Sequence, residues 1–285
     1  MLLCALGLMF CFRAGVWNIG AEGQLLMGAA LGSALAVHMA PDVGGWIIVP
    51  LLLLGMLGGA LWATVPAFLK TRFGANEILS SLMLTYVAIL LLSALVHGPL
   101  RDPDGSNFPH SRPIQDGALL PVIVEGTRLH LGAPLALLAA AAALFVHARH
   151  RLGFGVRLLG LAPRAAGYAG FDAGRLTWGV LLASGALAGL AGVIEVIGPI
   201  GRLNTSVSPG YGFTAIIVAF LGRLHPAGII VAAAVVALSY LGGELAQIML
   251  RIPNAVTGVF QGVLLFTLLG CDFGVRYRLR RLPAE

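Results

Sequence analysis

Long apolar runs separated by short polar segments dominate this chain. Five of the runs approach the roughly 20 residues that a helix needs to cross a membrane. They cover about 46–69, 78–97, 132–148, 176–197 and 227–249. Shorter apolar stretches lie at about 1–12, 25–40, 212–222 and 256–270. The pattern predicts an all-α, polytopic integral membrane protein with about eight or nine helical segments, including short or broken half-helices.

Glycines at a four-residue spacing lie on three of these runs. The pairs are Gly28/Gly32, Gly55/Gly59 and Gly185/Gly189. Residues four apart share a helix face, and small residues there let two helix backbones approach closely in lipid. We therefore predict tightly packed helices. Because no linker or low-complexity stretch interrupts the runs, we also expect a single transmembrane domain over residues 1–285.

Composition narrows the class of protein further. Hydrophobic residues make up 58% of the chain and charged residues 11%, whereas soluble domains carry roughly 25% charged residues. The mean hydropathy is +0.92. So little polar surface excludes a cytoplasmic enzyme, a secreted disulfide scaffold and a disordered chain. The cysteines, Cys4, Cys11 and Cys271, are far apart beside apolar runs, so neither a disulfide framework nor a metal site is predicted.

The basic residues predict which polar segments lie inside the cell. The net charge is +6, and the basic residues sit in short segments between apolar runs, which favours a topological role over nucleic-acid binding. Twelve of them fall in 70–77, 149–175, 223–226 and 271–285. Five fall on the opposite side, at Arg101, Arg112, Arg128, Arg202 and Arg251, and Arg13 stays unassigned. The first set is therefore expected to be cytoplasmic.

The segment 98–131 is then an external loop, and 149–175 is a cytoplasmic segment. Cysteines introduced at Ser106 and Ser111 of the external loop are expected to react with a membrane-impermeant thiol reagent. This loop is also the longest polar stretch on the outer side. We expect it to contribute to the surface on which an external partner protein docks.

Polar residues beside hydrocarbon mark a first candidate site. Asn18, Glu22 and Gln24 lie directly ahead of an apolar helix, where polar side chains are costly unless they face protein or water. Two interpretations stay open: these residues line a pathway through the membrane, or Glu22 caps the helix at 25–40 from an interfacial loop.

A glycine turn at 208–212 marks a second candidate. Gly210, Tyr211, Gly212 and Phe213 lead into about three helical turns, which the segment 222–226 with its proline closes. This predicts a half-helix whose amino end points into the membrane interior. A short packing helix is the alternative. Glu195 and Glu244 in the neighbouring runs face either the same pathway or a structural partner. Aromatic rings at Trp17, Tyr211, Phe213 and Phe220 serve either packing or stacking with a base.

The cytoplasmic segment contains a third candidate. Pro163 can open a short helix, the alanines after it can extend the helix, and Gly167 or Gly170 can end it. A short helix with a surface of small residues suits docking into a groove of a cytosolic partner. A plain connecting helix is the alternative.

Five sequence blocks together resemble the permease subunits of bacterial ABC importers of the ribose, branched-chain amino acid and nucleoside branch. The blocks are NIGAEGQ at 18–24, GANEILSSLMLTY at 74–86, GPLRDPDGSNFPHS at 98–111, GLAPRAAGYAGF at 160–171 and GYGFTAIIVAFLGRLHPAG at 210–228. They occur in the order expected of that branch. The third block most resembles the larger nucleoside-type permeases.

The resemblance implies a transport subunit and not an enzyme, located in the bacterial plasma (inner) membrane. It implies nucleosides or related simple sugars as substrates, delivered by an external substrate-binding protein. The implied partners are a cytosolic ABC ATPase, which binds the ATP and Mg²⁺, a second permease, identical or homologous, and the lipid bilayer. No cofactor on this chain and no nucleic-acid partner is expected.

The resemblance also assigns roles to residues. The substrate pathway is expected to include Asn18, Glu22, Gln24, Glu195, Gly210, Tyr211, Gly212 and Phe213. Docking onto the ATPase is expected to involve Gly160, Pro163, Arg164, Ala165, Ala166, Ala169 and Gly170, with the loop 70–77 as the next candidate.

Other functions remain as alternatives. A branched-chain amino acid or sugar permease of the same branch fits the same blocks. An ion-coupled secondary transporter or a membrane enzyme fits less well, because the apolar runs lack clustered Asp, Glu and His residues and a convergent catalytic set. Such permeases usually carry another spanning helix before the block at 18–24. The start is thus misassigned or truncated, or this member lacks that helix, and the topology before about residue 46 stays open.

Overall fold

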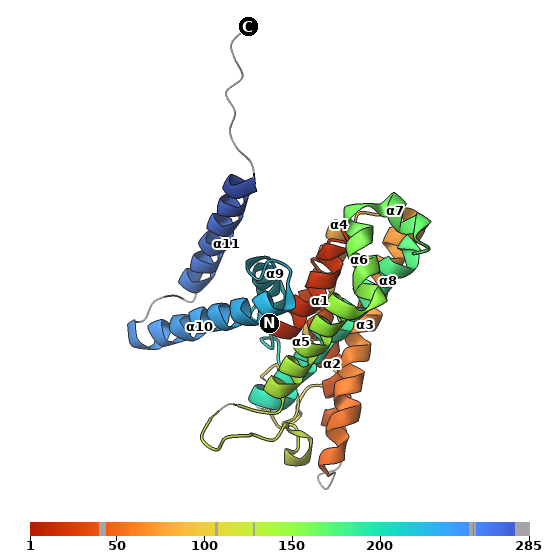
Figure 1. Cartoon of the computed structure of the whole chain (residues 1–285). Helices are drawn as coiled ribbons and strands as arrows, with labels where there is room; N and C mark the ends of the chain where they lie inside the picture. Colours follow the sequence, from red (N-terminus) through yellow and green to blue (C-terminus); the bar gives the residue numbers. More distant parts are fainter. Residues whose placement is uncertain (40–43, 106–107, 128, 251–252, 254, 277–285) are drawn as a thin grey trace.

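A computed structural model describes residues 1–39, 44–105, 108–127, 129–250, 253 and 255–276, and most of these residues lie in helices (Figure 1). The helices are α1 (Leu2–Arg13), α2 (Ala21–Val37), η1 (Gly45–Ile47), α3 (Ile48–Phe73), α4 (Glu77–His97), η2 (Asp116–Ala118), α5 (Gly132–Arg149), α6 (Arg151–Leu161), α7 (Pro163–Tyr168), α8 (Ala173–Glu195), η3 (Val196–Ile200), α9 (Tyr211–Leu221), α10 (Pro226–Leu250) and α11 (Ala255–Arg276). Only isolated β-bridges form among the described residues, which confirms the all-α prediction.

Five helices in the described part of the chain are long and apolar enough to cross a membrane. They cover Gly45–Phe73, Glu77–His97, Gly132–Arg149, Ala173–Ile200 and Pro226–Met249. These are the five runs predicted from hydropathy, extended by a few residues at their ends. The shorter apolar runs form α1, α2, α9 and α11. The sequence did not predict α6, which makes the cytoplasmic segment more helical than expected.

The predicted glycine pairs meet in one place, where α2, α3 and α8 cross. A Cβ atom on Gly28 would collide with the backbone of Gly189, and a Cβ atom on Gly59 would collide with the Gly185 carbonyl. Gly55 lies against Val193 and the Gly189 carbonyl. The three helices therefore touch backbone to backbone, as the four-residue spacing predicts.

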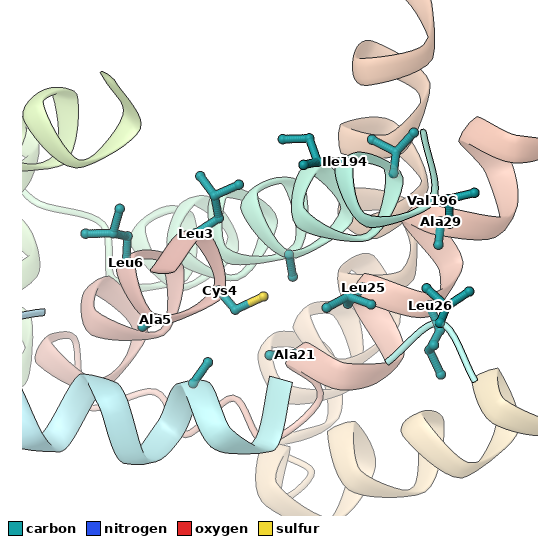
Figure 2. Packing of buried hydrophobic residues seen from close by; sticks show 14 of the residues in the cluster. Leu3, Cys4, Ala5, Leu6, Ala21, Leu25, Leu26, Ala29, Ile194 and Val196 are labelled. Carbon is teal, nitrogen blue, oxygen red and sulfur yellow. The ribbon is translucent and has the colours of Figure 1, made fainter. Parts of the chain in front are cut away.

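The first helix lies at the centre of the molecule. Most residues of α1 are buried, and Leu6, Leu8 and Met9 are fully enclosed. Figure 2 shows Leu3 and Leu6 of α1 beside α8, with Leu25 of α2 close by. A helix that is apolar on every side is stable only when protein or lipid covers all of it. This explains why a run of only 12 residues forms a regular helix here.

The last two helices extend away from the others. In Figure 1, α10 leaves the bundle from its amino end, and α11 lies beyond it. Large apolar side chains on both helices are exposed: Leu238 is 67% exposed, Ile248 77% and Phe266 80%. Apolar surface of this extent needs a bilayer or another membrane subunit to cover it.

The segment between α4 and α5 folds back onto the end of α8. Ser111 N donates to the Leu203 carbonyl (2.8 Å), and Leu120 N donates to the Ile197 carbonyl (2.8 Å). Ser111 Oγ also accepts from Leu203 N (2.9 Å), and Ser111 is fully buried. The expectation that Ser111 is accessible is therefore wrong, because a hydroxyl that completes a buried backbone contact has no exposed surface. Ser106, Arg128, Arg251, Arg278, Arg280 and Arg281 lie outside the described residues.

Thiol labelling should report the side on which this segment lies. In cells whose outer membrane has been permeabilised, a cysteine that replaces the exposed Glu125 should react rapidly with a membrane-impermeant maleimide. The reason is that the distribution of basic residues predicts this segment on the outer side of the inner membrane. Replacing Ser111 with cysteine should give slow labelling in the same cells, because that site is buried. Labelling of the Glu125→Cys variant only after the inner membrane is broken would show that the topology is the reverse of the predicted one.

Candidate functional site

The amino ends of α2 and α9 meet inside the protein. The Glu22 carboxylate accepts a hydrogen bond from Gly212 N over 2.6 Å, although 190 residues separate the two in the chain. Glu22 is 4% exposed, and the Ser208 side chain lies within hydrogen-bonding reach of the same carboxylate. A negative group at a helix amino end satisfies free N–H groups and the helix dipole. The alternative in which Glu22 caps its own helix is wrong, since α2 begins at Ala21 and Glu22 bonds α9.

Local chemistry explains why α9 begins at this place. Gly210 adopts a φ of 99°, which favours glycine. Ser208 Oγ then accepts a hydrogen bond from Tyr211 N (2.9 Å). A Cβ atom on Gly212 would collide with the backbone of Ala21 and Glu22. Gly212 thus lets α9 lie directly on α2.

A short helix of 11 residues forms here, and it ends at Leu221, directly before the predicted closing segment 222–226. The chain turns through Gly222, where Arg223 and Leu224 adopt φ values of 53° and 52°, and Pro226 begins α10. Non-glycine residues in this left-handed region are held there by their surroundings. Here Arg13 Nε donates to the Leu224 carbonyl over 2.7 Å, which also places the unassigned Arg13 at the end predicted to be cytoplasmic.

The two amides of the first candidate segment bind each other. Asn18 Nδ2 donates to Gln24 Oε1 (3.0 Å) and to Ser184 Oγ of α8 (3.1 Å). Asn18 Oδ1 accepts from Gly20 N (3.0 Å). Asn18 and Ser184 are fully buried and Gln24 is 1% exposed. A satisfied, buried amide network of this kind fixes the position of the chain, so these residues orient the α1–α2 turn from which Glu22 projects.

Aromatic rings surround α9. Phe12 stacks on Phe220 with a centroid distance of 5.2 Å, and Trp17 lies 6.2 Å from the same ring. These three rings pack on one another, and Trp17 is also 43% exposed. Phe213 is 37% exposed and forms none of these ring contacts.

The carboxylates of the neighbouring helices lie in different surroundings. Glu195, the last residue of α8, is half-buried, and Glu244 on α10 is exposed. Tyr211 is half-buried and its ring lies 5.8 Å from that of Tyr240. The structure therefore brings together Glu22 and residues 208–213, while the pathway role of Glu195 stays a prediction.

Replacing Glu22 with alanine should loosen α9. The change leaves Gly212 N buried without its acceptor, which costs about 1–3 kcal/mol. Transport by the purified complex in liposomes should fall by about tenfold or more, while Glu22→Gln, which keeps an acceptor oxygen, should retain most of it. Wild-type transport by Glu22→Ala would show that the contact with Gly212 is dispensable.

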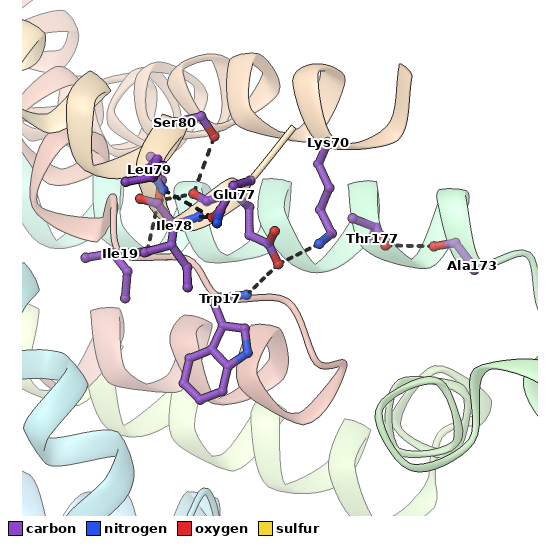
Figure 3. A network of polar contacts seen from close by, with 11 residues as sticks. Trp17, Ile19, Lys70, Glu77, Ile78, Leu79, Ser80, Ala173 and Thr177 are labelled. Atoms are coloured by element: carbon purple, nitrogen blue, oxygen red, sulfur yellow. Dashed lines mark hydrogen bonds and ion pairs between the residues drawn. The ribbon is translucent and has the colours of Figure 1, made fainter. Parts of the chain in front are cut away.

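A second polar cluster joins the loop before α2 to the α3–α4 loop. The Glu77 carboxylate accepts from Trp17 N (3.3 Å) and pairs with Lys70 Nζ (2.5 Å), as Figure 3 shows. Ile19 N donates to Ser81 Oγ (3.1 Å). The Asn76 side chain caps α4 by accepting from Ile78 N (2.9 Å). This cluster fixes the loop 70–77, the second candidate for docking of a cytosolic partner.

The third candidate segment forms the predicted short helix. It begins at Pro163 and ends after Tyr168, and Gly170 adopts a φ of 82° at its end. Its exposed face is formed by Pro163, Arg164, Ala165, Tyr168, Ala169 and Gly170. Tyr168 is 95% exposed, although it is not among the predicted docking residues. A large aromatic side chain standing alone on a small-residue helix is the signal that would have identified it.

Of the residues expected on the docking face, Ala166 points into the protein instead, and Gly160 packs against the backbone of Arg13. Ala166 is fully buried against the cluster that contains Cys11 and Ala14. A Cβ atom on Gly160 would collide with the Arg13 carbonyl. Their small size therefore serves packing within this chain, because helices that touch the bundle must present small residues on the inner face. The docking role of the outer residues stays a prediction.

The amino-acid sequence is similar to a family of transport proteins and to several of their members. Residues 1–269 match the family described as branched-chain amino acid transport system / permease component. A glucose ABC transporter permease protein of Haloferax volcanii is 36% identical to this chain, over 98% of the chain and 76% of that protein. A guanosine ABC transporter permease protein of Bacillus subtilis is 31% identical, over 100% of the chain and 82% of that protein.

A nucleoside ABC transporter permease protein of Lactococcus lactis is similar over a shorter length. It is 28% identical, over 82% of this chain and 66% of that protein. No solved structure matches the chain.

Proposed function

The chain belongs to the family of branched-chain amino acid transport permease components, and within that family we propose that it carries nucleosides or related simple sugars. It is an ABC importer permease of the plasma (inner) membrane, a multi-pass transport subunit and not an enzyme. An ABC permease works with an ATPase and a substrate-binding protein. The observation that carries the substrate class is the similarity, over the whole chain, to a guanosine permease.

The contact between Glu22 and Gly212 supports a mechanism for this function. It places the amino end of a half-helix inside the protein, the arrangement found where substrates cross at membrane depth. Movement of α2 is transmitted to α9 through this buried hydrogen bond. Closure of the ATPase pair would move α7, and this movement would then change the position of α9 at the pathway. This chain binds no ATP, Mg²⁺ or nucleic acid in this mechanism.

Two further partners belong to the proposal. The exposed apolar surface of α10 and α11 suits a second permease, homologous or identical, with lipid covering the remainder. The pathway would then lie between the two permeases, with Phe213 of α9 on its wall. The charge distribution predicts that the segment 98–131 lies outside the cell. This segment would bind the substrate-binding protein.

Transport in liposomes tests the substrate class. We expect labelled guanosine to be transported by the complex with its ATPase in the presence of ATP and a substrate-binding protein, and excess unlabelled adenosine or uridine to compete. Glucose is the second candidate, because the Haloferax volcanii relative is a glucose permease. Uptake of glucose with no competition by nucleosides would assign the sugar instead. Uptake of leucine alone would overturn both.

The exposed ring of Phe213 should distinguish a base from a sugar. Stacking of a base on an aromatic side chain contributes about 1–3 kcal/mol, so Phe213→Ala should lower guanosine transport by about tenfold. Phe213→Tyr keeps the ring and should transport normally. Equal transport by the alanine and tyrosine variants would show that Phe213 does not contact the base.

A further inference from the structure

One end of the bundle holds a cavity lined by basic side chains. The cavity, of about 640 Å³, lies where α5, α6 and the α7–α8 connection meet. Its polar lining is His147, Arg149, His150, Arg151 and Arg157, and no acidic residue is among the residues that line it. We call it the basic cavity. It lies at the end of the bundle that carries most of the positive charge.

The charges around this cavity are not balanced by the protein nearby. Arg13 and Arg157 both direct a guanidinium nitrogen at His147 Nε2, over 3.1 and 3.3 Å. A ring nitrogen that accepts from two arginines carries no proton, so His147 brings the two cations together without neutralising them. The nearest carboxylate along the chain, Asp172, pairs with Arg175 (3.6 Å). Converging cations of this kind favour a bound anion.

An apolar groove continues from the basic cavity along the membrane-spanning part of the protein. The groove, of about 730 Å³, runs between α5 and α8 with Phe10 of α1 beneath it. Gly170 and Phe171 line both spaces, so the groove and the basic cavity adjoin. From Arg175 to Leu190 of α8 the groove extends ~22 Å at 1.5 Å per residue. This exceeds half of a hydrocarbon core of ~30 Å.

From these two spaces we propose that the protein binds an anionic phospholipid. The phosphate group lies in the basic cavity, near Arg149, Arg151 and Arg157, and an acyl chain lies in the groove between α5 and α8. A basic pocket at the end of membrane helices is suited to an anionic headgroup, and the adjoining groove selects a lipid over free phosphate. Because α7 lies beside the cavity, the lipid would hold the docking segment in position.

Lipid binding to the purified, full-length permease tests the proposal. The protein is delipidated in detergent and titrated with dioleoylphosphatidylglycerol, dioleoylphosphatidylcholine or inorganic phosphate, and bound lipid is counted by native mass spectrometry. We expect phosphatidylglycerol to bind about tenfold more tightly than phosphatidylcholine. The double variant Arg149→Gln/Arg151→Gln should lose that preference. Arg72→Gln/Arg223→Gln removes the same charge outside the cavity and should keep it.

A second variant tests the groove separately. Gly179 faces open space in the groove, so Gly179→Leu should fill it without disturbing the fold. We expect this variant to bind both lipids about tenfold less tightly. Equal binding of the two lipids to the wild type, or equal effects of the two double variants, would overturn the proposal. Tight competition by inorganic phosphate with no effect of Gly179→Leu would assign a soluble phosphate site instead.

Discussion

Replacing Gly189 with alanine is expected to reduce the amount of folded protein strongly. A Cβ atom at this position would collide with the Gly55 carbonyl and lie 2.9 Å from Gly59 Cα. Backbone atoms cannot rotate away as a side chain can, so α3 and α8 must separate. Overpacking of a core typically costs about 1–3 kcal/mol, and here the strain falls on the interface between three helices. Size-exclusion profiles and the melting temperature in detergent measure the loss.

Gly179→Ala is the matched control on the same helix. A Cβ atom there meets no other atom within 4 Å. Alanine is favoured over glycine inside a helix by up to about 1 kcal/mol, so this variant should melt at the same temperature as the wild type or slightly above it. Similar melting temperatures for Gly189→Ala and Gly179→Ala would contradict the backbone contact among α2, α3 and α8.

Replacing Tyr168 with alanine is expected to separate the permease from its ATPase. Tyr168 is 95% exposed on α7, and an isolated exposed tyrosine of this kind is typical of residues whose truncation costs about 2 kcal/mol or more at an interface. Co-purification of the ATPase and ATP-driven uptake should fall by about tenfold or more. The amount of permease in the membrane should not change, because the side chain contributes little to the fold.

Phe73→Ala distinguishes the two candidate docking segments. Phe73 ends α3 beside the loop 70–77 and is 69% exposed. If α7 is the docking element, this variant should retain the ATPase. Loss of the ATPase from Phe73→Ala but not from Tyr168→Ala would place docking at the loop 70–77. Ala166 is not a useful position for this test, since its burial makes any larger side chain a folding defect.

Hydropathy alone determined the membrane-spanning helices, because the free energy of placing a residue in lipid depends on that residue and its neighbours in the chain. The four-residue glycine spacing likewise determined which helix faces would touch, since helix geometry fixes which residues share a face. The short helix at 163–168 and the half-helix after Gly210 followed from proline and glycine, whose backbone preferences are local.

Tertiary structure alone decided the partners of the polar residues. Glu22 lies at a helix start in the sequence, yet its carboxylate bonds Gly212, 190 residues away. Ala166 and Tyr168 lie two residues apart on α7, and only packing against the cluster that contains Val156 and Leu181 decided that one is buried and the other exposed. Local preferences describe what a segment can form. The contact that forms depends on which distant part of the chain packs against the segment and on which face of the segment stays exposed.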